Sequence, residues 1–447
     1  MPTHPNRSIL QGSARTPLYD AHSTGPVPVD ERFEVTVRVR RKAPLQGMTT
    51  DGFHADQLPR KRRYLSHDRY AIEHGADPAD LEKIEAFARE HHLIVVESSS
   101  ARRSVFLSGT AAAFAEAFGT TIEHFEYDGG TYRGRTGPLT VPSDLTDVIE
   151  GVFGIDDRPI AKPHFQRYQP APSIGIRAHT AGNSFTPPEL AQRYNFPTGL
   201  DGSGQCIAII ELGGGYRIAD IKAYFQKLGL PVPDVKTIRV DGASNRPSTP
   251  DGADGEVMLD IEVAAAIAPK ARIAVYFAPN TDKGFLDAIT TATHDTINNP
   301  SVISISWGSA ENNWTAQAMT SFDQAFQTAT ALGITICCAS GDNGSADGET
   351  DGNAHVDFPA SSPFALGCGG TKLTTTGNTI SSETVWNEGT TSATGGGVSA
   401  FFPLPTYQSK AGVPLSANAP HKAGRGVPDV AGDADPATGY FVRVDGQ

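Results

Sequence analysis

The chain has 447 residues and a formal net charge of −13, with 19% charged and 38% hydrophobic residues. Its length suits two or three domains, and its composition is that of a globular protein. No apolar run approaches the roughly 18 residues of a membrane-spanning helix, and residues 1–20 lack the apolar core of a signal peptide.

Charge and histidine are unevenly distributed. Nearly all of the net negative charge lies after residue 178, whereas all but three of the 13 histidines precede residue 180. The acidic second part argues against nucleic-acid binding. Histidine gains charge below about pH 6.5, while carboxylates lose theirs nearer pH 4. The two parts are therefore a candidate pH-dependent interface, with ordinary surface histidines as the alternative.

The first part has the pattern of a small α/β sandwich. Residues 1–30 are rich in Pro, Ser and Thr and predict a loosely ordered N-terminus. Alternating and helical patterns then predict strands and helices in turn: strand 33–40, helix 78–91, strand 104–108, helix 111–118 and strand 121–127. Residues 156–185 are rich in Pro and basic residues and predict an exposed linker, open to proteolysis.

The second part has the pattern of a parallel sheet with helices on both faces. Near-continuous apolar runs alternate with helical stretches: strands 205–212, 271–278, 301–307 and 334–340, and helices 218–228, 255–268, 284–296 and 314–332. Ligand sites in such sheets lie beyond the carboxyl ends of the strands. This rule selects Glu211, the glycines 213–215, Trp307 with Gly308, and residues 341–344.

One predicted helix, 255–268, carries two carboxylates on one face. At about 100° per residue, Glu256 and Asp260 share the face of Val263 and Ile267, while Glu262 lies opposite. Like charges at this spacing repel by a few tenths of a kcal/mol, which is unfavourable for a purely structural helix. A solvated first turn is the alternative. If the chain performs nucleophilic catalysis, its base is expected to be Glu256.

Other motifs are weaker. The four cysteines have no zinc spacing and are expected to be free, mostly buried thiols: Cys206, Cys337, Cys338 and Cys368. Residues 342–357 fail the EF-hand template, although another ion stays open. The glycines 213–215 do not match a dinucleotide-binding loop.

Several segments, in order, resemble the sedolisin family, serine-carboxyl peptidases with a subtilisin-like fold, and most of all its kumamolisin branch. The segments are DGEVMLDIEVAAAIAPKARIAVYFAPNTDKGF, SVISISWGS, ASGDNGSADGETDGNAHVDFPASSP, TGGGVSAFFPLP and GRGVPDVAGDADPATGY. The resemblance covers residues 188–447 strongly and the first part as a propeptide. It implies four regions: a loosely ordered N-terminus (1–30), an inhibitory propeptide domain (31–155), a linker with the activation cleavage region (156–185) and a C-terminally incomplete peptidase domain (186–447).

The resemblance also implies roles for individual residues. Glu256 would be the general base and Asp260 the carboxylate that orients it, with Asp342 at the oxyanion position. Glu211 and Trp307 would support Glu256. Substrate would bind as an added strand, and the residues implied for this are Ser306, Trp307, Gly308 and Asp357.

The family's nucleophile is the serine of a Gly-Thr-Ser motif, expected beyond Gln447, so this chain alone is expected to be inactive. Calcium is expected from the family, with ligands beyond Gln447 and no metal site within this chain. The resemblance further implies protein and peptide substrates, inhibition by the chain's own propeptide domain, a monomer and secretion. No nucleic-acid or membrane partner is expected.

Acid activity follows from the chemistry of a carboxylate triad. Glu256 must be ionised while Asp342 holds a proton. At pH 7 an aspartate with the reference pKa is protonated about once in a thousand, which costs about 4 kcal/mol, and near pH 4 this cost almost vanishes. Two alternatives stay open: a non-catalytic peptide-binding member of the same fold, and a glycosidase that uses Glu256 and Asp342 as its acid pair.

Overall fold

The computed structural model describes residues 6–45, 61–167, 184–248, 252–389 and 392–447. The chain forms two compact units, each described by itself. Unit 1 contains residues 1–160, 279–296 and 313–333, and unit 2 contains the rest. Two helices of the predicted second part, α7 and α8, therefore belong to unit 1. The domain boundaries predicted from the sequence stay predictions.

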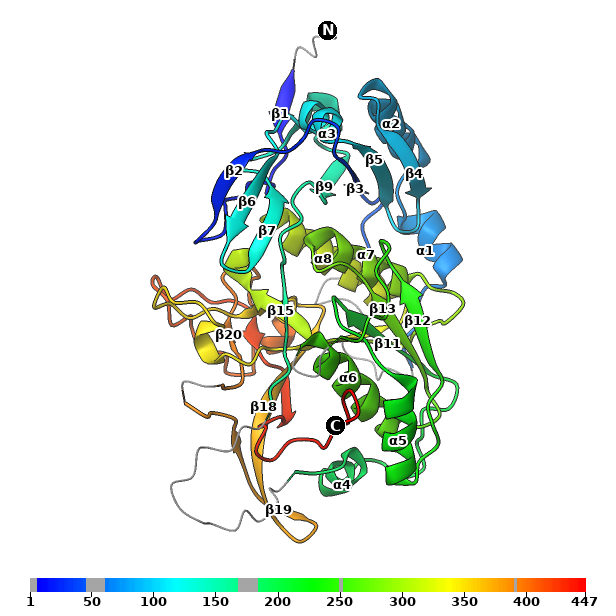
Figure 1. The fold of residues 1–447 in the computed structure, drawn as a ribbon, viewed down its shortest axis with the longest axis vertical. Helices are drawn as coiled ribbons and strands as arrows, with labels where there is room; N and C mark the ends of the chain where they lie inside the picture. Colours follow the sequence, from blue (N-terminus) through cyan, green and yellow to red (C-terminus); the bar gives the residue numbers. More distant parts are fainter. Residues whose placement is uncertain (1–5, 46–60, 168–183, 249–251, 390–391) are drawn as a thin grey trace. The chain divides into compact units, whose positions relative to one another are not determined.

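Unit 1 is an α/β structure with a four-stranded antiparallel sheet in the order β4-β5-β3-β9 and a three-stranded sheet in the order β2-β6-β7 (Figure 1). Its strands are β1 (Arg7–Ile9), β2 (His22–Pro26), β3 (Arg32–Val39), β4 (Ile94–Ser99), β5 (Ser104–Thr110), β6 (Glu123–Tyr127), β7 (Gly130–Gly134), β8 (Thr140–Pro142) and β9 (Ile149–Phe153). Its helices are α1 (His67–His74), α2 (Pro78–Glu90), α3 (Ala111–Phe118), α7 (Asp282–Thr293) and α8 (Ala316–Ala331).

The core of unit 1 follows from the sequence pattern. Alternation in β3 directs Val35, Val37 and Val39 into the core, where they meet Ile84 of α2 and Phe114 of α3. The expectation of a loosely ordered N-terminus was wrong for the part of it that the structure describes. There β1 pairs with β8 and β2 pairs with β6, so the N-terminal segment completes two sheets.

Unit 2 is built on one mixed sheet in the order β12-β13-β11-β14-β16-β18-β19, with β22 also paired to β18. The strands of this sheet are parallel to one another except for β19. Two smaller sheets have the orders β10-β15-β17 and β20-β21. The strands of the whole unit are β10 (Lys162–Pro163), β11 (Cys206–Glu211), β12 (Val235–Arg239), β13 (Arg272–Phe277), β14 (Val302–Ile305), β15 (Trp307–Ala310), β16 (Thr335–Ala339), β17 (Asp357–Phe358), β18 (Leu366–Thr376), β19 (Thr379–Val385), β20 (Gly397–Val398), β21 (Gly426–Val427) and β22 (Val430–Asp433). The helices are α4 (Pro187–Arg193), α5 (Ile218–Leu228) and α6 (Ala253–Ile267).

The parallel strands place the candidate residues on one edge. The central strands are apolar on both faces, as a sheet covered by helices requires. Val257 and Ile261 of α6 pack against Ile209 of β11 and Val275 of β13, so α6 is fixed to the sheet along its length. Its first turn consequently stands next to the carboxyl ends of β11 and β14. Across the described residues, no helix is long and apolar enough to cross a membrane.

Candidate active site

Helix α6 presents Glu256 and Asp260 as the sequence predicts. Gly252 precedes the helix as its N-cap and Ala268 ends it, just before Pro269. Because nearly every side of this helix is apolar, most of its surface is covered, and Glu256 is buried. Asp260 lines a cavity. The solvated first turn considered from the sequence is therefore wrong for Glu256.

Residues after β11 and β14 contact this pair. The Ser306 hydroxyl donates to both carboxylate oxygens of Asp260, at 2.9 Å each. The indole Nε1 of Trp307 donates to Glu211 Oε2 at 2.9 Å, and both side chains are buried. Glu211 ends β11 and Trp307 begins β15, so the two come together because β11 and β14 are adjacent and parallel. Asp260 is thus held by a hydroxyl and Glu211 by an indole.

The carboxyl groups at this edge hold their protons unusually strongly. Burial raises the pKa of Asp260 to about 7 and that of Asp342, which follows β16, to about 6. Burial also raises the pKa values of Glu256 and Glu211 well above the usual range, and the negative charge of Asp260 raises both further. Several acids crowded in a poorly solvated site resist ionisation because each charge opposes the next. The structure thus brings Glu256, Asp260, Asp342 and Glu211 together.

The segment that follows unit 1 lies inside this site. Strand β10 pairs antiparallel with β15, with Lys162 opposite Gly308 and Pro163 opposite Trp307. The amide of His164 donates to the carbonyl of Ser306 at 3.0 Å. The prediction of an exposed linker is therefore wrong for Ile160, Ala161 and the His164 side chain, which are buried, while Lys162 and Gln166 are exposed. The pairing depends on the edge that β15 offers, which no sequence period reveals. The rest of the expected cleavage region, residues 168–183, lies outside the described residues.

Two side chains of this segment, those of His164 and Phe165, contact residues of the peptidase part of the chain. His164 Nε2 lies 3.3 Å from Asp357 Oδ2, and both side chains are buried. A methyl group on Gly255 would lie 2.3 Å from the Phe165 ring, so the glycine leaves the space that this ring uses. The resemblance predicted Asp357 as a substrate-binding residue. The sequence did not predict that His164 contacts Asp357 or that Phe165 packs against Gly255. The adjacent apolar Ile160, Ala161 and Phe165 are the signal that marks this segment as buried.

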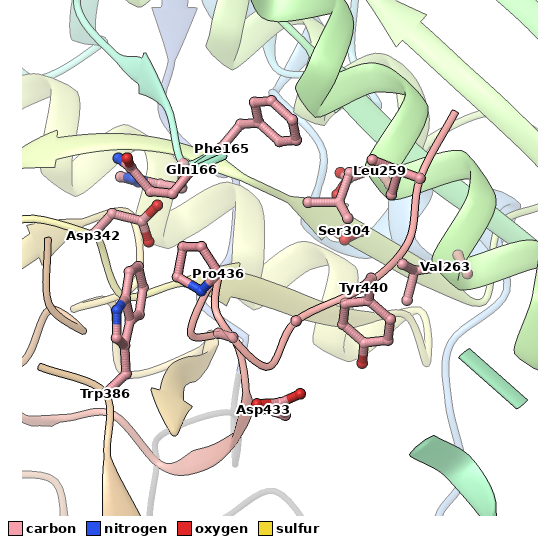
Figure 2. A pocket seen from close by; sticks show the side chains of 16 residues that line it. Phe165, Gln166, Leu259, Val263, Ser304, Asp342, Trp386, Asp433, Pro436 and Tyr440 are labelled. Atoms are coloured by element: carbon pink, nitrogen blue, oxygen red, sulfur yellow. The ribbon is translucent and has the colours of Figure 1, made fainter. Parts of the chain in front are cut away.

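A cavity of about 310 Å³ opens beside the carboxylates. Figure 2 shows Asp342, Gln166 and Trp386 on one side of it, with Leu259 and Val263 of α6 on the other. The sequence did not single out several residues that line it: Trp386, Asp433, Pro436 and Tyr440. Asp433 ends β22, and the others lie outside strands and helices, where no periodic pattern marks them. The segment GRGVPDVAGDADPATGY includes Asp433, Pro436 and Tyr440, but the resemblance gave them no role.

Metal ligands do not gather in the described part of the chain as a group of three or more His, Cys, Asp or Glu side chains. Asp347 lies beside Asp342 and Asp357, and burial raises its pKa to about 8. No step of the chemistry below depends on calcium. All four cysteines are free, two of them buried and two half-buried.

Comparison with known proteins adds the family. Residues 21–158 match the family described as Pro-kumamolisin, activation domain, and residues 245–435 match the Subtilase family. Kumamolisin from Bacillus sp. (strain MN-32) is 48% identical over 445 residues, which cover 99% of this chain and 81% of that protein. Sedolisin from Pseudomonas sp. (strain 101) is 28% identical over 404 residues, 86% of this chain and 67% of that protein.

A solved structure supports the fold. Pseudomonas sedolisin (serine-carboxyl proteinase), complexed with two molecules of pseudo-iodotyrostatin, is 29% identical with a TM-score of 0.52, over 60% of this chain and 75% of that chain. The predicted subtilisin-like fold with a propeptide domain is confirmed, while its predicted C-terminal incompleteness is not borne out. The chain belongs to the sedolisin family of serine-carboxyl peptidases, as a precursor that carries its activation domain.

Proposed function

We propose that the chain is the precursor of an acid-acting endopeptidase in which Glu256 is the general base, Asp260 positions it and Asp342 stabilises the oxyanion. The observation that supports this is the cluster of buried carboxyl groups with raised pKa values. With its pKa raised to about 6, Asp342 keeps its proton throughout the acid range and can donate a hydrogen bond to a developing oxyanion. At neutral pH it loses that proton and the ability to donate.

The segment from Lys162 to Gln166 keeps this site latent in two ways. It occupies the edge of β15 where a substrate would add as a strand. It also lies over the carboxyl cluster, and the buried Glu256 beneath it has a pKa well above the usual range. A protonated glutamate cannot accept the proton of a nucleophile. Removal of the segment would admit water, lower the pKa of Glu256 and so generate the base.

The nucleophile is expected from the family resemblance alone. The prediction that it is the serine of a Gly-Thr-Ser motif beyond Gln447, and that this chain alone is inactive, stays a prediction. Ser306 is a serine that contacts the carboxylates, but its hydroxyl already donates a hydrogen bond to Asp260. In this proposal Ser306 positions Asp260 and does not attack the substrate.

Substrates would be peptides in an extended conformation. We expect a bound peptide to pair antiparallel with β15, as Lys162 does opposite Gly308. Asp357, which meets His164, would favour a basic residue at the corresponding position of the substrate. We expect a secreted monomer, as the family resemblance implies, with the chain's own activation domain as its inhibitor.

The test is peptide hydrolysis against pH by a chain that carries the Gly-Thr-Ser motif, compared with E256Q, D260N and D342N variants. We expect a maximum in acid and a loss of at least about 100-fold in kcat for each variant. Glu262→Gln is the matched control, because Glu262 is a buried glutamate on the opposite face of α6. A maximum at neutral pH would contradict the proposal, and peptide binding without hydrolysis would favour the non-catalytic alternative.

A further inference from the structure

A second, much smaller cavity lies in unit 1. Its volume is about 10 Å³, which is room for a single atom-sized occupant. Its walls come from β3, the turn between β4 and β5, and helices α1, α7 and α8, which are labelled in Figure 1. The residues that matter for what it binds are Arg38, Arg102, Arg103, Thr293 and His294.

Two hydrogen-bond donors in this wall have no partner. Arg38 Nε and Thr293 Oγ1 are both buried, and neither atom has a hydrogen-bond partner in the described structure. Arg38 otherwise donates from Nη1 to the carbonyl of Arg102. Buried donors are rarely left unsatisfied in folded proteins, so two such donors on one cavity indicate a missing acceptor.

The charge around the cavity is positive. Arg103 pairs with Glu150 at 2.8 Å and Arg102 pairs with Glu97. Within the described residues Arg38 has no carboxylate at ion-pair distance, and no carboxylate lines the cavity. Burial and the charge of Arg103 lower the pKa of Arg38 to about 9, and burial with the nearby His67 and Arg38 lowers the pKa of His294 to about 3. Both shifts show that a further positive charge is disfavoured in this wall.

The size and the donors select the chemical class of the occupant. A carboxylate or phosphate has several heavy atoms and exceeds the space of one. A water molecule would also fit, because the hydroxyl of Thr290 donates to the Asp287 carbonyl and keeps lone pairs that can accept one of the water hydrogens. Water, however, would leave the buried charge of Arg38 without a counter-charge. A monoatomic anion needs donors only, and it offsets the charge of Arg38.

We propose that this cavity binds one halide ion, chloride under ordinary conditions, held by Arg38 Nε and Thr293 Oγ1. Because Arg38 lies on β3 and Thr293 on α7, the ion joins the N-terminal sheet of unit 1 to a helix from the second part of the sequence. It would stabilise unit 1 independently of any catalytic step.

The experiment is thermal unfolding of the intact chain at pH 7 in sodium bromide or chloride, against sodium gluconate at the same ionic strength. With halide at ten times its dissociation constant, the folded-to-unfolded ratio rises about elevenfold, or about 1.4 kcal/mol. For a unit of this size the melting temperature should then rise by roughly 3–6 °C and saturate.

The decisive variant is Thr293→Val, which keeps the shape of the side chain and removes only the unpartnered hydroxyl. Without an ion this change leaves no polar group stranded, so folding in gluconate should be unimpaired. We expect it to weaken the apparent halide affinity at least tenfold. Ser321→Ala is the matched control, because Ser321 also has a buried, unpartnered hydroxyl in unit 1 but does not line the cavity.

A direct measurement does not depend on the variants. A bromide-soaked crystal should give an anomalous peak within hydrogen-bond distance of both Arg38 Nε and Thr293 Oγ1. A water alone at this position, melting temperatures that are equal in halide and gluconate, or an undiminished halide effect in Thr293→Val would each overturn the proposal.

Discussion

His164 and Asp357 face each other within unit 2, with 3.3 Å between imidazole Nε2 and a carboxylate oxygen. Burial lowers the pKa of His164 and raises that of Asp357, so the surroundings weaken the charge of each group. A basic group that enters this space therefore meets an acid with little competition from water. The contact links the segment before the peptidase domain to the choice of substrate that we propose.

Replacing Asp357 by asparagine should reduce this preference. In the processed, active enzyme we expect D357N to lower kcat/KM by about 10–100-fold for a peptide with arginine at the position of His164, because the arginine charge can ionise a carboxyl group but not an amide. The measurement is the kcat/KM ratio for two peptides that carry arginine or leucine there. D351N, at an exposed aspartate, is the control, and an unchanged ratio in D357N would disprove the role of Asp357.

A methyl group on Gly255 should displace the segment from Lys162 to Gln166. Glycine to alanine inside a helix normally stabilises by up to about 1 kcal/mol. At Gly255 the added carbon would lie 2.3 Å from the Phe165 ring, so the ring must move. We expect G255A to speed proteolysis within residues 161–167 about tenfold. In an F165A background the same change should have no further effect, and an equal effect in both backgrounds would refute this explanation.

Asp342 should make the folded chain more stable in acid. Its pKa is raised from 3.8 to about 6, so at low pH the group is protonated in both folded and unfolded states. As the pH rises from about 4 to 6, the unfolded chain ionises first and stability falls by about 2 kcal/mol. D342N should remove this fall. Denaturant unfolding at several pH values measures it, with the exposed Asp128→Asn as control, and identical slopes for wild type and D342N would contradict it.

His294 should have the opposite effect on unit 1. Its ring lies 6.1 Å from that of His67 and 5.5 Å from that of Tyr70, measured between centroids, and its pKa is lowered to about 3 by burial and by the charges of His67 and Arg38. Below pH 6.5 the unfolded histidine gains a proton that the folded one resists. Between pH 6.5 and 4.5 unit 1 should lose about 2 kcal/mol.

The measurement for His294 is hydrogen exchange of α7 amides at the two pH values, corrected for intrinsic rates. It is made without halide, because a bound anion would offset the charge. His294→Phe should abolish the loss of protection, while His22→Phe, at an exposed histidine, should not. Equal protection of wild-type α7 at both pH values would show that His294 does not destabilise unit 1 in acid.

Local patterns predicted most of the regular structure. The helix at 255–268 corresponds to α6, and its spacing placed Glu256 and Asp260 on one face. The continuous apolar runs predicted the parallel strands, and the rule that sites follow such strands selected Glu211, Trp307 and Asp342. These features repeat every two or 3.6 residues, so a short window of sequence contains them.

The pairing partners were decided by the tertiary structure. Residues 161–166 show no period, yet β10 is a strand because the edge of β15, more than 140 residues away in sequence, accepts it. Likewise β1 and β2 form because β8 and β6 offer edges. Strands of two to five residues carry too little pattern to be read alone.

The sequence by itself determined which acids could act together, because helix geometry and strand order fix their faces and ends. Only the tertiary structure decided how strongly those acids hold protons, that a segment of the same chain lies against them, and that Arg38 and Thr293 share a cavity. The reason is physical: burial, and the low polarity that comes with it, depends on atoms brought together from distant parts of the chain.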